Sequence, residues 1–216
     1  MFPLRDSIRS SRIPFVTWLL LLANVWVFFL ELSGGESFIT RFALTPSTIS
    51  GDLASWYPFV TSMFLHGGWF HLFSNMWFLW IFGDNVESAL GKLGYLFFYL
   101  ACGIIAAFVQ YIASPGSVIP MLGASGAIAG VLGAYVILFP HAYITSLVVL
   151  GFYVTVIDIP AIVYLPYWFV LQLLAGVGQI GQVAISGGVA FLAHVGGFVA
   201  GVVGATFIKL GRATNG

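Results

Sequence analysis

Long apolar stretches alternate with short polar ones along this chain. A helix needs about 20 apolar residues to cross a bilayer, and the pattern predicts six such spans. We expect them at about 13–30, 69–86, 93–113, 124–139, 161–178 and 188–208. The expected fold is therefore all-α, a polytopic membrane helix bundle with six transmembrane helices. Cytoplasmic tails over 1–12 and 209–216 would flank one membrane domain over 13–208.

The apolar stretch 141–157 leaves a seventh span open. It is short, Gly151 interrupts it, and it is rich in β-branched residues, so we predict a partly membrane-embedded connection instead. With six spans, Arg41 is the one Lys or Arg on its side of the membrane, whereas with seven spans Lys209 and Arg212 join it there. The positive-inside rule therefore favours six spans with both termini cytoplasmic.

The composition fits a membrane protein and excludes several other classes. Charged residues make up 6% of the chain, where soluble globular domains average about 25%. The net charge is zero, and without a basic face the chain is not a nucleic-acid binder. One cysteine excludes a disulfide framework and a cysteine-based zinc site. The histidines lack acidic or cysteine partners, so we expect no metal and no other cofactor.

The longest predicted loop, about 33–68, joins the first two spans on the outer side, and its second half is apolar enough to lie in the membrane interface. The termini are short and carry no transit peptide. We therefore expect a multi-pass protein of a bacterial-type plasma membrane.

Four polar residues inside the predicted spans are the candidates for function, because such groups are costly in lipid. His71 and Asn75 lie near the start of the second span, Ser125 starts the fourth, and His194 lies about 9 Å into the sixth. With six spans these three helices all run from the outer to the inner side. All four residues then lie in the outer leaflet at similar depth, whereas seven spans would send His194 to the inner end.

Ser125 and His194 are the residues that point to nucleophilic catalysis. Gly123 permits a tight turn before Ser125, which opens a helix whose unpaired N–H groups suit a developing oxyanion. Each residue alone could simply pack helices, but their matching depth favours a Ser–His dyad without an orienting carboxylate. Small residues let helices approach closely, and they recur on both spans, at Gly126 and Gly130 and at Gly197 and Gly201.

His71 and Asn75 are four residues apart and project from one helix face. Both can donate hydrogen bonds, and we predict that they complete an anion hole where Ser125 attacks. The alternative is a polar pair bonded to each other or to the loop. We expect His66 to tie the loop, and Gln110, near the outer end of the third span, to hold water for hydrolysis.

Three motifs of this chain resemble those of one known family. Residues 64–75, Phe-Leu-His-Gly-Gly-Trp-Phe-His-Leu-Phe-Ser-Asn, are similar to the second-helix His…His-x-x-x-Asn signature of rhomboid intramembrane serine proteases. Residues 123–126 resemble their nucleophile motif, and residues 193–201 their last-helix histidine motif. The motifs occur in the family's order, and the resemblance covers about 56–208.

This resemblance implies a six-helix bundle that cleaves transmembrane segments of other proteins near the outer face. It implies Ser125 as the nucleophile and His194 as the base, with the oxyanion held by His71, Asn75 and the Ser125 backbone N–H. The expected partners are single-pass transmembrane substrates, which would enter sideways between the second and fifth spans, and the lipid bilayer.

Two positions depart from the family pattern. Many members carry an aromatic residue four positions after the serine, against which the histidine ring rests, but Ala129 stands here. Ring support must then come from elsewhere. Many also carry a Trp-Arg pair in the first loop, where this chain has Trp56-Tyr57-Pro58.

Two other functions remain as alternatives. A rhomboid-like protein that binds membrane helices without cutting them would usually have lost the serine or the histidine, and neither is lost here. A transporter or channel would extend its polar groups across the membrane midplane, whereas these cluster in one leaflet.

Overall fold

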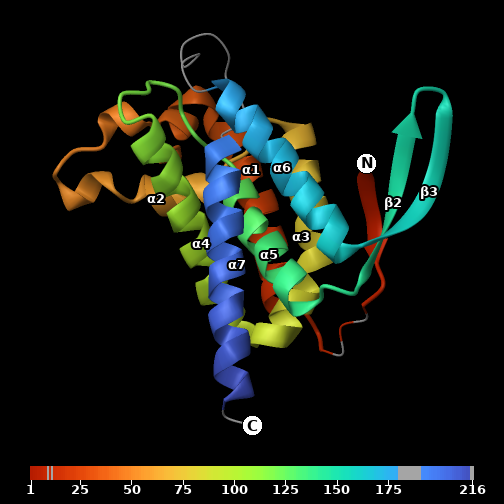
Figure 1. The fold of residues 1–216 in the computed structure, drawn as a ribbon. Helices are drawn as coiled ribbons and strands as arrows, with labels where there is room; N and C mark the ends of the chain where they lie inside the picture. The colour runs from red at the N-terminus through yellow and green to blue at the C-terminus, as the bar shows by residue number, and fades with distance from the viewer. Residues whose placement is uncertain (9, 11, 180–190, 215–216) are drawn as a thin grey trace.

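The computed structural model describes residues 1–8, 10, 12–179 and 191–214. Its described part is mostly helical, with a small three-stranded sheet at one side (Figure 1). The helices are α1 (Phe15–Phe42), α2 (Pro58–Thr61), α3 (Trp69–Leu90), α4 (Lys92–Ala113), α5 (Ser125–Leu138), α6 (Ala161–Gln179) and α7 (Phe191–Ala213). The strands are β1 (Phe2–Asp6), β2 (Tyr143–Leu150) and β3 (Tyr153–Pro160). The predicted start of the last span at 188–190 and the final residues 215–216 lie outside the described residues.

A helix overlaps each predicted span, but these helices differ in length and polarity. Among the described residues, α1, α4 and α7 are long and apolar enough to cross a bilayer, while α5 and the apolar part of α6 are shorter. Polar side chains interrupt α3, among them Asp84 and Glu87. The described part is therefore mostly helical, and three of its helices could cross a membrane by length and composition.

The all-α prediction is wrong for the stretch 141–157. It forms a hairpin in which β2 and β3 pair antiparallel, and β1 adds to the other edge of β2, giving the order β1-β2-β3. β-branched residues favour strands, and the turn contains Gly151 at a φ of +62°, a left-handed conformation that suits glycine. The segment is therefore a β-hairpin and not a seventh helical span.

The first helix also differs from its prediction. α1 continues beyond the expected end at residue 30 as far as Phe42, with a kink at Gly35, whose φ is +60°. Glu31 therefore lies within the helix rather than next to a loop, and its buried carboxylate accepts a hydrogen bond from the His66 backbone N–H at 2.9 Å. Short helical turns and α2 fill much of the remaining connection to α3.

α5 lies in the middle of the bundle, with α7, α4 and α3 packed around it (Figure 1). Every residue from Gly126 to Val136 is buried. The predicted close approach of two glycine-rich helices is confirmed, because a Cβ at Gly197 would collide with the carbonyl oxygen of Gly126, and one at Gly201 with that of Gly130. The backbones of α5 and α7 are therefore in direct contact.

Hydrogen bonds near their last residues show how α3, α5 and α7 are oriented relative to one another. Lys209 Nζ, near the end of α7, donates to the carbonyl oxygen of Ile137 at the end of α5, 3.0 Å away. Arg212 donates to the carbonyl oxygen of Ala89 at the end of α3. Cationic side chains are favourable partners for the exposed carbonyls of helix C-termini. The three helices therefore end together, so that their first turns share the opposite end of the bundle.

Candidate active site

Ser125 and His194 meet at the shared first turns of α5 and α7. Ser125 is the first residue of α5, and His194 lies in the first turn of α7, where its side chain is buried. His194 Nε2 lies 2.6 Å from Ser125 Oγ. The glycine contact below them makes this distance possible, because larger side chains would hold the two backbones apart. The structure therefore brings together the two residues predicted to form a dyad.

A glutamine takes the place of the missing orienting carboxylate. Gln172 Oε1, on α6, lies 2.7 Å from His194 Nδ1. An amide oxygen can only accept, so Nδ1 carries the proton and Nε2 is left free to accept one from Ser125. The sequence analysis missed Gln172. The signal was present, since this residue is an amide inside the predicted fifth span.

Two aromatic side chains support the imidazole of His194. The ring centroid of Trp168, on α6, lies 6.0 Å from that of His194 at an interplanar angle of 37°. Phe191, one turn before His194, meets it edge-on at 6.1 Å. Ala129 is fully buried, and its methyl side chain is too small to support the histidine ring. The ring support that the family pattern places on α5 therefore comes here from α6 and from α7 itself.

His71, in the first turn of α3, turns one ring edge toward the serine. Its Nδ1 accepts a hydrogen bond from the Gly67 backbone N–H at 3.3 Å, so its proton lies on Nε2. A Cβ at Gly123 would lie 2.9 Å from His71 Nε2 and 3.6 Å from Ser125 Oγ. Gly123 also has a φ of +130°. Glycine is thus required there both for the backbone conformation and for the approach of the ring.

Asn75 lies one turn beyond His71, and its side chain is 6% exposed. Among the described residues its Nδ2 has no hydrogen-bond partner, and no hydrogen bond joins it to His71. The first turn of α5 likewise has no side-chain cap. A buried donor without a partner costs about 1–3 kcal/mol. Unpaired donors of this kind are suited to binding an anion, and those of the first turn of α5 lie at the serine itself.

His66 and Gln110 each form a hydrogen bond with a distant part of the chain, His66 through its backbone N–H and Gln110 through its side-chain oxygen. The His66 backbone N–H bonds to Glu31, while its ring is fully buried, with its centroid 5.2 Å from that of His71. Burial, with a smaller effect of the nearby His71, lowers the pKa of His66 to about 3, so the ring is neutral at physiological pH. Gln110 Oε1 accepts the Ala193 backbone N–H at 3.2 Å and thereby caps the start of α7.

A cavity of about 30 Å³ lies beside Ser125. Its lining includes Ser62, Gly103, Ala106 and Ala193, but not Gln110. One water molecule occupies about 30 Å³ in the liquid. The space beside the serine is therefore large enough for about one water molecule. Among the described residues, no group of three His, Cys, Asp or Glu side chains is placed to hold a metal ion.

Comparison with known proteins finds one family over most of this chain. A sequence model of the Rhomboid domain matches residues 53–210. The chain is 33% identical over 123 residues to the Putative rhomboid protease YdcA of Bacillus subtilis, which is 56% of this chain and 61% of that protein. It is 36% identical over 126 residues to Rhomboid protease GluP of the same organism, which is 56% of this chain and 24% of that protein.

Two relatives whose names do not mention a protease have sequence identities at least as high. The Presenilin-associated rhomboid-like protein, mitochondrial, of Bos taurus is 36% identical over 118 residues, 53% of this chain and 30% of that protein. The Rhomboid-like protein 11, chloroplastic, of Arabidopsis thaliana is 40% identical over 86 residues, 40% of this chain and 30% of that protein. The chain spans less than two thirds of the length of each of these relatives.

Proposed function

This chain belongs to the rhomboid family, and from that premise we propose that it is an intramembrane serine endopeptidase. The observation that carries the proposal is the 2.6 Å contact between Ser125 Oγ and His194 Nε2. Donors suited to an oxyanion site support it too: the uncapped first turn of α5 begins at Ser125, and Asn75 Nδ2 is buried without a partner among the described residues. Relatives named as rhomboid proteases support the same activity.

The first half of the proposed reaction is acyl transfer. His194 Nε2 takes the proton of Ser125 as its oxygen attacks the carbonyl carbon of the scissile peptide bond. The imidazolium then gives that proton to the leaving amine as the carbon–nitrogen bond breaks. The product is an ester between Ser125 and the N-terminal fragment of the substrate. Hydrolysis of this acyl-enzyme by water, with His194 again as the base, completes the cycle.

The negative charge of the tetrahedral intermediate needs fixed donors. We assign this role to His71 Nε2–H, Asn75 Nδ2–H and the backbone N–H groups at the start of α5, including that of Ser125. They are held in place before substrate arrives, so the transition state gains their hydrogen bonds without reorganisation. Loss of one such donor typically lowers kcat by about 10²–10³.

We also propose that Gln172 positions the catalytic histidine. Its amide oxygen fixes the tautomer that leaves Nε2 unprotonated, and it stabilises the imidazolium that forms when Ser125 attacks. This role belongs to an aspartate in proteases with a full triad. A neutral amide is cheaper to bury than a carboxylate, and this suits a site formed within a membrane bundle.

The membrane setting remains part of the proposal. We place the six longest helices across the bilayer, with both termini cytoplasmic and the dyad near the outer face of a bacterial-type plasma membrane, although two relatives are named as mitochondrial and chloroplastic. Single-pass substrates would enter sideways between α3 and α6. Substrates with small or helix-breaking residues near the cut are expected, since a helical peptide bond is shielded from attack.

Cleavage of a purified single-span substrate in detergent tests the proposal. We expect the wild-type protein to cleave it and to react with a fluorophosphonate probe, with Ser125→Ala abolishing both. The matched control is Ser33→Ala, since Ser33 is an exposed serine of α1. If Ser125→Ala cleaves as fast as wild type, the protease proposal fails.

The alternative function is that of a rhomboid-like protein that binds membrane helices without cutting them. Two relatives whose names say rhomboid-like and not protease support this alternative. The probe separates the two functions. Covalent labelling of Ser125 requires an activated hydroxyl, which a protein that only binds helices does not need.

A further inference from the structure

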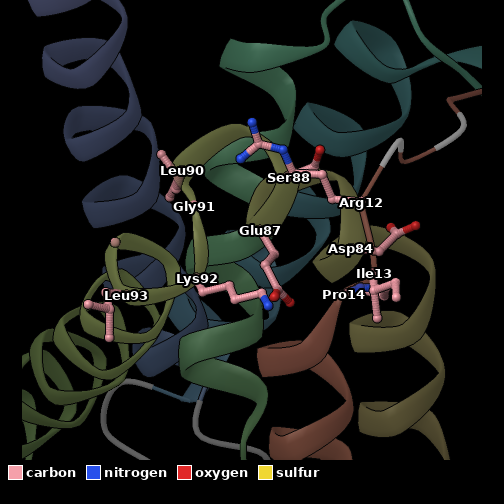
Figure 2. Close-up of a pocket in the computed structure, with 11 residues that line it drawn as sticks. Arg12, Ile13, Pro14, Asp84, Glu87, Ser88, Leu90, Gly91, Lys92 and Leu93 are labelled. Carbon is pink, nitrogen blue, oxygen red and sulfur yellow. The ribbon is translucent and has the colours of Figure 1, made fainter.

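A second pocket lies at the opposite end of the bundle from the dyad. It has a volume of about 460 Å³ and opens between the start of α1 and the turn that joins α3 to α4 (Figure 2). Its polar lining includes Arg12, Asp84, Glu87, Ser88 and Lys92. Pockets that bind small molecules typically measure about 300–1,000 Å³, so this one is large enough for a ligand.

One of its carboxylates is already committed to the fold. Glu87 is buried, and it accepts hydrogen bonds from the backbone N–H groups of Val16 and Thr17 at 2.9 and 2.7 Å and from the Thr17 hydroxyl at 2.8 Å. It therefore caps the first turn of α1, where an anion is favoured by the helix dipole. This contact fixes the pocket wall on the α1 side.

The other three charged groups have no ionic partner among the described residues. Asp84 accepts hydrogen bonds from backbone N–H groups of its own helix, among them that of the adjacent Asn85 at 2.7 Å. Lys92 Nζ lies 5.4 Å from the ring centroid of Phe15. The guanidinium of Arg12 and the carboxylate of Asp84 point in opposite directions (Figure 2). One unpaired anion and two unpaired cations thus surround a single pocket.

The surroundings of the pocket are apolar. Ile13 and Leu93, which also line it, are 67% and 72% exposed. The pocket lies at helix ends, where a membrane bundle meets the lipid headgroups. A ligand here would therefore have a charged part inside the pocket and an apolar part along these side chains.

We propose that this pocket binds the headgroup of a phospholipid that carries a primary amine, as in phosphatidylethanolamine. The phosphate lies between Arg12 and Lys92 and accepts from Ser88, while the ammonium group donates to Asp84. Because Glu87 is already bonded to α1, Asp84 is the carboxylate left for the ammonium group, and Arg12 and Lys92 are the two cations left for the phosphate. A choline headgroup has the same charges but no N–H donor, so it cannot bond to the carboxylate.

Lipid titration of the delipidated full-length protein, followed by native mass spectrometry, tests this proposal. We expect at least about tenfold tighter retention of phosphatidylethanolamine than of phosphatidylcholine, which corresponds to one hydrogen bond to a charged group. Asp84→Asn should remove this preference, and Arg12→Gln combined with Lys92→Gln should weaken retention of both lipids. Arg41→Gln, which removes a cation far from the pocket in sequence and outside its lining, is the control.

Equal retention of the two lipids by the wild-type protein would overturn the proposal without reliance on any variant. The proposal is also overturned if the Arg12→Gln, Lys92→Gln double variant unfolds at the wild-type temperature and retains as much lipid as Arg41→Gln. Competition with inorganic phosphate distinguishes a headgroup site from a site for a free anion. The proposal requires that millimolar phosphate leave the bound lipid in place, and displacement of the lipid would contradict it.

Discussion

Replacement of Gln172 by leucine is the sharpest test of the geometry around the histidine. Leucine is similar in size but has no acceptor for His194 Nδ1, which now lies 2.7 Å from the amide oxygen. The imidazole then loses the bond that selects its tautomer. In the transition state, the imidazolium loses its stabilising partner, and its Nδ1–H is left buried without an acceptor.

The expected loss follows from the value of one hydrogen bond to a charged group, about 1.5–3 kcal/mol. At about 1.4 kcal/mol for each tenfold change in rate, this predicts a decrease in kcat of about 10- to 150-fold. Trp168 and Phe191 still hold the ring from two sides, so the lower part of this range is expected. Gln172→Glu keeps an acceptor and should retain more activity than Gln172→Leu.

The assay is steady-state cleavage of a single-span substrate, with thermal unfolding of each variant measured in the same detergent. We expect kcat to fall with little change in KM, because Gln172 acts through the histidine. Leu171→Ala, at an exposed neighbour on α6, is the matched control and should change kcat little. A folded Gln172→Leu protein with wild-type kcat would refute the positioning role of the amide.

Three further predictions concern the fold that supports the site. Gly197→Val should separate α5 from α7, lowering both the melting temperature and the activity, whereas Gly211→Ala, with nothing within 4 Å of the added Cβ, should leave both unchanged. Glu87→Gln should lower the free energy of unfolding by about 1–3 kcal/mol, since it weakens the cap of α1; a melting temperature equal to wild type would contradict this. The folded state holds the pKa of His66 near 3, below the ordinary 6.5, so the unfolded state binds the proton more readily and stability falls as pH drops below 6.5. His66→Phe should therefore reduce the loss in melting temperature between about pH 7 and about pH 5, and an unchanged loss would count against this origin of the acid sensitivity.

The apolar pattern predicted the helices well, because a helix buried in lipid or in protein needs a long apolar stretch. This requirement does not depend on which other helices it packs against. It failed at 141–157, where β-branched residues and a turn glycine form a hairpin that pairs with β1. Apolar runs in strands and in helices look alike when they are short. The end of α1 was also missed, because the helix runs past residue 30 to a kink at Gly35 and a second helical stretch follows as far as Phe42.

By itself, the sequence determined which residues could do chemistry: a serine at a helix start, a histidine followed by small residues, and two donors on one helix face. These follow from local spacing and from the cost of polar groups in lipid. The tertiary structure alone decided what completes the site. Gln172 and Trp168 come from α6, and nothing in local sequence says which face of that helix meets His194. Contacts between distant segments depend on how whole helices pack, and here that packing depends on the direct backbone contact between α5 and α7.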